Sequence, residues 1–307
     1  LFVSASQGDC GAERRHLEER RALVWERASE RFCEEQPCPA VRIQVFRVYA
    51  ATDAIRRSGR GVERNPDLGG RVNSKTVELI AEISTNHGGC LDLAKEFIWR
   101  FAETGADWVK FQHTRVAHLR PDDPQYAWFQ RAEFSCDQFA ELKAECERAG
   151  TRFLTTVYHV ADVPEVQRLG LEAVKIGSGE AGDRALVTTT ERAFKRVFIS
   201  DGLAHPMGFL HERLGCVSRY PAPHGCVPGH FSACDGLVGW SDHCRGLESC
   251  EVAILRGARV IEKHVCLPQQ ARSPKCYEAT VEEFKALRAF ADDDPVAKYV
   301  GRWQWST

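Results

Sequence analysis

The pattern of apolar and polar positions changes near residue 73. From Val77 onward, short runs of β-branched and aromatic residues alternate with amphipathic stretches of helical period. The strand candidates are Val77–Ser84, Trp108–His113, Arg152–Tyr158, Ala173–Gly177, Arg196–Ser200, Leu214–Ser218, Leu237–Trp240 and Arg259–His264. The helix candidates include Leu91–Glu103, Cys136–Arg148, Leu247–Arg256 and Val281–Phe290. Eight repeats of a parallel strand followed by a helix favour a closed barrel. The predicted fold is therefore an α/β protein of the (β/α)8 TIM barrel class.

Two regions depart from this repeat. The first contains a charged helical stretch at residues 11–35, a short β-prone run and a linker rich in Gly and Arg. We therefore predict an N-terminal helical extension at residues 1–73 and a barrel domain at residues 74–307. The second region lies between the fifth and sixth strands, where Pro206 and Gly208 interrupt a short connection. An irregular fifth β/α unit is predicted there, with a helix of at most a turn or two.

Composition narrows the functional classes. The chain has 307 residues, with 41 Lys and Arg against 43 Asp and Glu, and a net charge of -2. Because this balance provides no broad attraction for nucleic acid or an anionic membrane, neither is an expected partner. The 13 cysteines include no CxxC pair, which is typical of reduced thiols in a cytoplasmic protein. No apolar segment approaches the roughly 20 residues that span a bilayer.

Polar side chains gather at the ends of the predicted strands, where TIM barrels carry their reactive groups. They include Glu82, Lys110, Gln112, Thr156, Lys175, Ser178, Glu180, Ser200, His243 and Glu262. A buried lysine is costly unless it is paired, so Lys110 and Lys175 indicate either structural ion pairs with nearby glutamates or a bound anion. Hydroxyl groups on other strands favour the anion, because ammonium and hydroxyl groups together suit a phosphate and a carboxylate. Phosphoenolpyruvate carries both.

Six ordered segments resemble one enzyme family. They are ELIAEISTNHGG (78–89), GADWVKFQHT (105–114), EAVKIGSGE (172–180), YPAP (220–223), GLVGWSDH (236–243) and GARVIEKHV (257–265). In order and spacing they resemble the barrel domain of N-acetylneuraminate (sialic acid) synthases and of their legionaminate and pseudaminate relatives. The resemblance covers roughly residues 77 to 292. We expect the C-terminal antifreeze-like domain of full-length relatives to be absent.

The resemblance implies a C–C bond-forming transferase that condenses phosphoenolpyruvate with a sugar-like aldehyde, giving a 2-keto acid and phosphate. It implies that Glu82 and Glu180 lie beside the sugar, and that a divalent metal, Mn²⁺ or Mg²⁺, polarises the aldehyde oxygen. His243 corresponds to one metal-binding histidine, and Glu262 is a further candidate ligand. The phosphoenolpyruvate-binding residues implied are Lys110, Thr156, Lys175, Ser178 and Ser200, to which we add Gln112 at the end of the second strand.

The metal site is where this chain departs from the family pattern. The second metal-binding histidine is replaced by Gly215. Cys216 offers a thiolate, but as the adjacent residue it is expected to point to the opposite face of the strand. Lys275 stands where relatives carry an acid, so its ammonium group is a candidate electrophile in place of the metal charge.

These departures leave alternatives open. One is a degenerate synthase-like barrel that acts as a binding or assembly subunit. Another is a repurposed aldolase or lyase that works without a metal, through a lysine near the site. In each case the expected ligands are small molecules, namely phosphoenolpyruvate and an aldehyde acceptor, and a homodimer is a candidate assembly.

Overall fold

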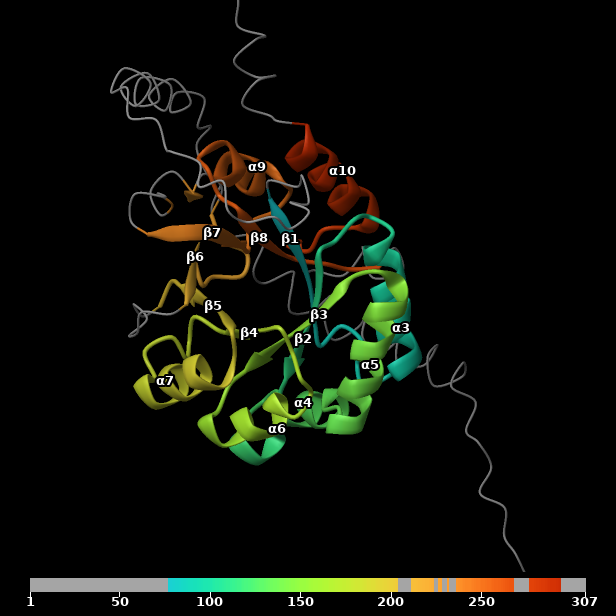
Figure 1. Ribbon diagram of the computed structural model, residues 1–307, viewed down its shortest axis with the longest axis vertical. Coiled ribbons are helices and arrows are strands. Elements are labelled where there is room, and N and C mark those ends of the chain that lie inside the picture. The colour runs from blue at the N-terminus through green and yellow to red at the C-terminus, as the bar shows by residue number, and fades with distance from the viewer. Residues whose placement is uncertain are drawn as a thin grey trace, which may run out of the picture. The chain divides into compact units, whose positions relative to one another are not determined.

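The computed structural model describes residues 77–203, 211–223, 226–227, 231, 236–267 and 276–293. The predicted N-terminal extension, its boundary near residue 73 and Lys275 lie outside the described residues. Within them, the strands form a closed barrel in chain order, surrounded by helices (Figure 1). The barrel prediction is therefore confirmed.

Eight parallel strands make the barrel wall. They are β1 (Glu78–Ser84), β2 (Trp108–His113), β3 (Arg152–Val157), β4 (Ala173–Ile176), β5 (Arg196–Asp201), β6 (Glu212–Cys216), β7 (Leu237–Asp242) and β8 (Val260–His264). Each strand pairs in parallel with the next, and β8 pairs with β1. Each matches a predicted strand, with ends that differ by at most two residues.

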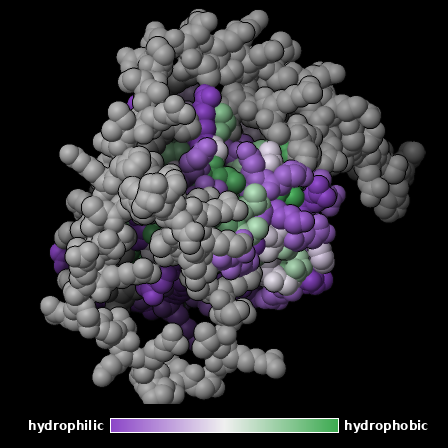
Figure 2. Space-filling view, turned by 90° about the horizontal axis from the view of Figure 1, so that it is seen from above, coloured by the Kyte–Doolittle hydropathy of each residue, from purple (hydrophilic) through white to green (hydrophobic). Residues whose placement is uncertain are grey.

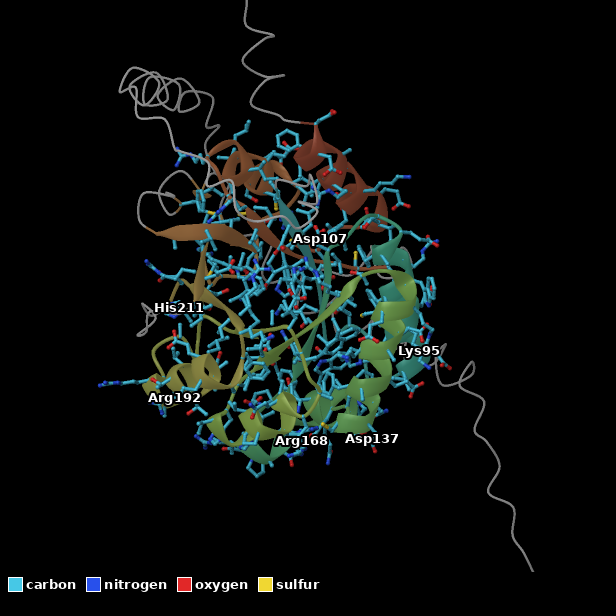
Figure 3. All side chains as sticks on the ribbon, in the orientation of Figure 1. Lys95, Asp107, Asp137, Arg168, Arg192 and His211 are labelled. Carbon is cyan, nitrogen blue, oxygen red and sulfur yellow. The ribbon has the colours of Figure 1, made fainter. Side chains whose placement is uncertain are left out.

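The helices lie outside this wall. They are α3 (Leu91–Ala102), α4 (Tyr126–Ala132), α5 (Cys136–Ala149), α6 (Val163–Gln167), α7 (Arg184–Ala193), α9 (Glu248–Leu255) and α10 (Val281–Asp292), with 3₁₀ turns at Val116–His118 and Val160–Asp162. None of the described helices is long and apolar enough to cross a membrane. Their exposed sides carry charge, as the labelled Asp137, Arg168 and Arg192 show (Figure 3). On the face seen in Figure 2, polar side chains of the described residues surround smaller apolar patches.

Alternation along the strands creates two apolar layers. Odd positions of β1, such as Leu79 and Ala81, face the helices and join the larger cluster. Even positions face the barrel interior, where a smaller cluster fills the middle of the barrel: Ile80, Trp108, Leu154, Ala173, Phe198, Leu214 and Val260. The barrel is thus closed by packed side chains below its carboxyl end. Any inward-facing residue one step further along a strand must lie above this plug.

The connection between β5 and β6 is short. It spans residues 202–211, of which 204–210 lie outside the described residues. This is fewer than the dozen or more residues of an ordinary parallel crossover, yet β6 still pairs directly with β5. The connection is therefore shorter than a usual parallel crossover, while the helix of at most a turn or two that was predicted there falls outside the described residues.

Candidate active site

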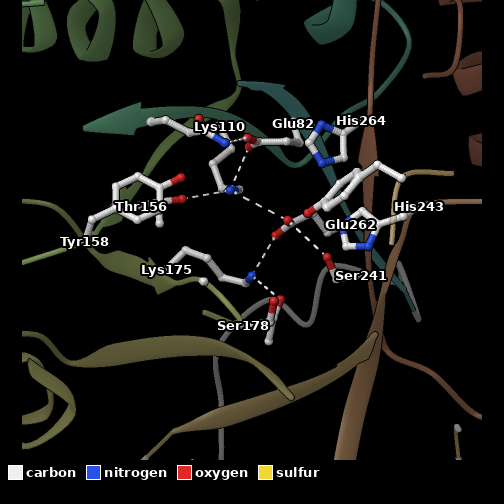
Figure 4. A pocket seen from close by; sticks show the side chains of 14 residues that line it. Glu82, Lys110, Thr156, Tyr158, Lys175, Ser178, Ser241, His243, Glu262 and His264 are labelled. Atoms are coloured by element: carbon white, nitrogen blue, oxygen red, sulfur yellow. Dashed lines mark hydrogen bonds and ion pairs between the residues drawn. The ribbon is translucent and has the colours of Figure 1, made fainter. Parts of the chain in front are cut away.

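The carboxyl end of the barrel holds a polar cavity of about 350 Å³, including the part open to solvent. Its lining residues come from most of the strands and from the loops that follow them. They are Glu82, Lys110, Gln112, Thr156, Tyr158, Lys175, Gly177, Ser178, Ser200, Tyr220, Ser241, His243, Glu262 and His264. Most of the predicted site residues therefore converge, and their charged ends point toward one another (Figure 4).

Lys110 is almost fully buried and is the better paired of the two lysines. Its Nζ lies 2.7 Å from Oε2 of Glu82 and donates a hydrogen bond of 2.9 Å to Oγ1 of Thr156. Oε1 of Glu262 lies 3.6 Å away. Burial lowers the pKa of Lys110, but the carboxylates of Glu262 and Glu82 outweigh it and raise the pKa above its ordinary value. Lys110 therefore stays cationic.

Lys175 is equally buried, but its positive charge is less well balanced by nearby carboxylates. Its Nζ lies 3.4 Å from Oε2 of Glu262 and donates a hydrogen bond of 2.5 Å to Oγ of Ser200. Burial and the charge of Lys110 hold the pKa of Lys175 below its ordinary value, in spite of Glu262. A second negative charge beside Lys175 would stabilise its cationic form. The glutamate that forms the ion pair with Lys175 is therefore Glu262, on β8.

The pKa values of the two central carboxyl groups, Glu262 and Glu82, shift in opposite directions. Burial raises the pKa of Glu262, but Lys110 and Lys175 lower it further, to about 2. Burial dominates at Glu82, whose pKa is raised although Lys110 lies beside it. When Glu82 takes up a proton, two lysines face one carboxylate and the cluster carries a net positive charge. Such a site favours an anion.

The other predicted residues occupy the edges of this cluster. Gln112 Nε2 donates a hydrogen bond of 3.1 Å to Oε1 of Glu82, and Oγ of Ser178 accepts one of 2.6 Å from Ser218. Glu180 does not line the cavity. It lies behind Gly177, where an added Cβ would come within 2.6 Å of its Oε2. Burial raises the pKa of Glu180.

His243 is held in one tautomer by the backbone. Its Nδ1 lies 2.8 Å from the carbonyl oxygen of Val217, which can only accept, so Nδ1 carries the proton and Nε2 keeps a lone pair. Burial lowers the pKa of His243, which favours the neutral ring. The ring of Tyr220 packs against it at 4.1 Å between centroids.

The sequence reasoning gave no role to five residues that line the cavity, namely Tyr158, Gly177, Tyr220, Ser241 and His264. The signal for two of them was spacing. Tyr158 comes two positions after Thr156, and His264 comes two positions after Glu262, so each continues an inward-facing row.

The orientation predicted for Cys216 was wrong. Its Sγ lies 3.4 Å from Oγ of Ser218, and its charge environment includes Lys175 and Glu262, so the side chain is on the cavity face. Gly215, its neighbour, pairs with Trp240, which belongs to the outer cluster. Leu214 lies in the interior cluster, so regular alternation along β6 places Cys216, two positions later, on the inward face and Gly215 on the outward face.

The described residues do not form a ready metal site. No group of three or more His, Cys, Asp or Glu side chains among them is arranged to hold a metal ion. Nε2 of His243 could serve as one ligand, but Glu262 contacts both lysines. The predictions for the metal and for Lys275 as its substitute therefore stay predictions.

Together, the fold and the cavity define a TIM-barrel protein with a buried cationic site at its carboxyl end. A comparison with protein-family models matches the NeuB family over residues 97–293. The chain therefore belongs to the NeuB family.

Individual relatives agree with this assignment. An N,N'-diacetyllegionaminic acid synthase from Campylobacter jejuni is 30% identical over 253 residues, covering 69% of this chain and 75% of the relative. An N-acetylneuraminate-9-phosphate synthase from Drosophila melanogaster is 29% identical over 247 residues, covering 69% and 66%. The crystal structure of an N-acetylneuraminic acid synthetase from Leptospira borgpetersenii in complex with citrate has a TM-score of 0.64 at 23% identity, covering 80% of this chain and 92% of that one. This last likeness supports the fold.

Proposed function

We propose that this chain condenses phosphoenolpyruvate with a sugar-like aldehyde, giving a 2-keto acid and phosphate. The observation that carries the proposal is the pair of buried ammonium groups of Lys110 and Lys175, which share the carboxylate of Glu262. Glu82, the second carboxyl group beside Lys110, has a raised pKa and leaves the cavity short of negative charge when it is protonated. Phosphoenolpyruvate would supply the missing charge through its phosphate and carboxylate. The relatives named as legionaminic acid and N-acetylneuraminate-9-phosphate synthases agree with a sugar-acid product.

Hydroxyl groups would complete the binding of the enol phosphate. Thr156 and Ser200 accept hydrogen bonds from the two lysines, so each can turn its own proton toward a ligand oxygen. Ser178 lies on the same wall of the cavity and receives its hydrogen bond from Ser218. Gln112 holds Glu82 in place. The reacting atoms would then be C3 of phosphoenolpyruvate and the aldehyde carbon.

The titrating groups have properties that suit two proton transfers. Glu82 has a raised pKa, so its neutral form can donate a proton to the aldehyde oxygen as the carbon–carbon bond forms. His243 is neutral with a free lone pair on Nε2, so it can accept a proton from the water that attacks C2. Phosphate then leaves C2, and the 2-keto acid remains.

The reaction is tested by incubating the full chain with phosphoenolpyruvate and a panel of N-acylated and unmodified aldoses. We expect release of phosphate together with a 2-keto acid, and loss of both in the variant K175M. The matched control is K95M, because Lys95 lies in α3, away from the cavity, and pairs with Glu141 at the surface. Turnover by K175M at the wild-type rate would contradict the proposal.

A second experiment adds a chelator to the active mixture and tests the metal proposal, since retained activity is expected if Lys275 supplies the positive charge.

A second function is favoured by one observation, the lowered pKa of Lys175. A lysine that is deprotonated more easily can form a Schiff base with a carbonyl substrate, as in an aldolase or lyase. Borohydride treatment in the presence of pyruvate distinguishes the two functions. A stable adduct on Lys175 would favour the aldolase, and its absence together with phosphate release would favour the condensation.

A further inference from the structure

Two cysteines from separate segments meet beside the cavity. Sγ of Cys226 and Sγ of Cys244 are 3.2 Å apart, although 18 positions separate the residues in the chain. Both are free thiols. Cys244 follows β7 directly after His243 and is buried, whereas Cys226 follows the YPAP segment and is partly exposed.

The backbone at Cys244 is firmly held. Nζ of Lys263 donates a hydrogen bond of 2.6 Å to its carbonyl oxygen and lies 2.5 Å from Oδ2 of Asp242. Ala222 forms a parallel bridge with Cys244, and its N–H donates to the carbonyl oxygen of His243 at 2.8 Å. The YPAP segment is therefore already joined to the end of β7 four residues before Cys226. The segment that leads to Cys226 and the end of β7 that leads to Cys244 are thus in backbone contact at Ala222.

We propose that Cys226 and Cys244 are a site of reversible oxidation, at which hydrogen peroxide converts the two thiols into a disulfide. A disulfide bond is about 2.05 Å long, so the sulfur atoms need to approach by roughly 1 Å. The proposal stands on this geometry and does not depend on the proposed function. The partly exposed thiol of Cys226 is the one that meets the oxidant, and the buried thiol of Cys244 resolves the product.

The chemistry balances without a further reactant. The thiolate of Cys226 attacks one oxygen of hydrogen peroxide, the O–O bond breaks, and a sulfenic acid forms with release of one water. The sulfur of Cys244 then attacks the sulfenic sulfur, the S–O bond breaks, and a second water leaves. The two thiols lose two electrons and two protons in total, and the peroxide is reduced to two waters. A dithiol reductant reverses the step by thiol–disulfide exchange.

The bond would tie the segment after β6 to the end of β7. This segment includes Tyr220, whose ring packs on His243 at 4.1 Å and lines the cavity. Oxidation would therefore add a covalent link to a segment that Ala222 already joins to the end of β7 by a backbone hydrogen bond.

The test is a peptide map of the full chain. The fully reduced protein is treated with a few equivalents of hydrogen peroxide, quenched in acid, alkylated and digested. We expect a linked pair of peptides containing Cys226 and Cys244, lighter by two hydrogen atoms than the sum of the free peptides. Dithiothreitol should return both in alkylated form.

Two variants make the assignment specific. C226S should lose the linked peptides, and C276S should keep them, because Cys276 is also partly exposed but lies in another segment. Recovery of both Cys226 and Cys244 as alkylated thiols after peroxide would overturn the proposal. So would linkage of Cys226 to any other cysteine, or its conversion to a sulfinic acid without a link.

Discussion

At the scale of single residues, the charge of the site depends on the few carboxylates that lie close enough to neutralise its buried lysines. Glu262 is the central group, since it lies within 3.6 Å of Lys110 and 3.4 Å of Lys175 and accepts a hydrogen bond from Ser241. A buried charge that loses its partner is strongly destabilising. Glu262 therefore stabilises the empty barrel as well as arranging the lysines for a ligand.

The variant E262Q tests this role through the pH dependence of stability. The pKa of Glu262 falls from the ordinary 4.5 to about 2 in the folded protein, so its ionised form stabilises the fold above about pH 4.5. This contribution is lost as the pH falls through about 2. At about pH 6 we expect the free energy of unfolding of E262Q to be about 3–5 kcal/mol lower than that of the wild type. The difference should shrink as the pH is lowered.

Urea unfolding at a series of pH values measures this difference. The control is E141Q, because Glu141 pairs with Lys95 at the surface and should show little difference at any pH. A gap between E262Q and the wild type that is independent of pH would rule out the ionised carboxylate as its source.

At the scale of elements, local signals decide which boundaries a sequence reveals. The start of α5 at Cys136 was predicted correctly, and there Ser135 and Gln138 form a capping box. The start of β6 was placed two residues too late, because Glu212 and Arg213 are charged. In the structure Glu212 pairs with Arg196 and Arg213 pairs with Asp201, so charged residues extend the strand. Such pairing cannot be seen along one segment.

The capping box predicts the effect of S135A. Oγ of Ser135 accepts a hydrogen bond from the backbone N–H of Gln138, and the Gln138 side chain accepts one from the Ser135 N–H. Removing the hydroxyl should lower the free energy of unfolding by about 1 kcal/mol. S135D restores an acceptor at the cap and should recover most of the loss in a chemical denaturation experiment. Equal losses in both variants would show that the side-chain acceptor at the cap is not the source of the lost stability.

Contacts between separate segments limit the prediction of the site as well. Lys110, Thr156, Lys175 and Ser200 could be predicted to converge, because regular alternation places them on inward-facing positions. The same alternation places Cys216 inward, two positions after Leu214, and the prediction failed because it put Gly215 on the inward face instead. The contacts of Glu262 with both lysines could not be predicted, because they join three strands across the barrel interior.

At the scale of the whole molecule, the residues that stabilise the fold and the residues of the candidate active site lie at opposite ends of the barrel axis. At the amino end, Arg196 pairs with Glu212 at 2.6 Å and Glu78 at 2.7 Å, and its guanidinium lies 4.3 Å from the ring centre of Phe198. The apolar plug that includes Phe198 lies between this cluster and the cavity. Groups at the amino end are therefore expected to affect folding and not turnover.

R196M tests this separation. The substitution removes the arginine partner of Glu212 and one of the two arginine partners of Glu78, which keeps Arg152, so the free energy of unfolding should fall by about 1–3 kcal/mol. The kcat/KM for the proposed condensation should stay within about twofold of the wild type at a temperature where both are folded. A large fall in kcat/KM without a change in stability would contradict the separation.

The central claim is that Lys110 and Lys175 bind phosphoenolpyruvate, and calorimetric titration of the full chain with this ligand tests it most directly. The account predicts saturable binding by the wild type and by the surface control K95M. It predicts that K175M, shown to be folded by its thermal transition, binds at least about tenfold more weakly, because one of the two buried ammonium groups that would contact the anionic ligand is lost. Binding of equal strength by K175M, or no binding by the folded wild type, would contradict the account.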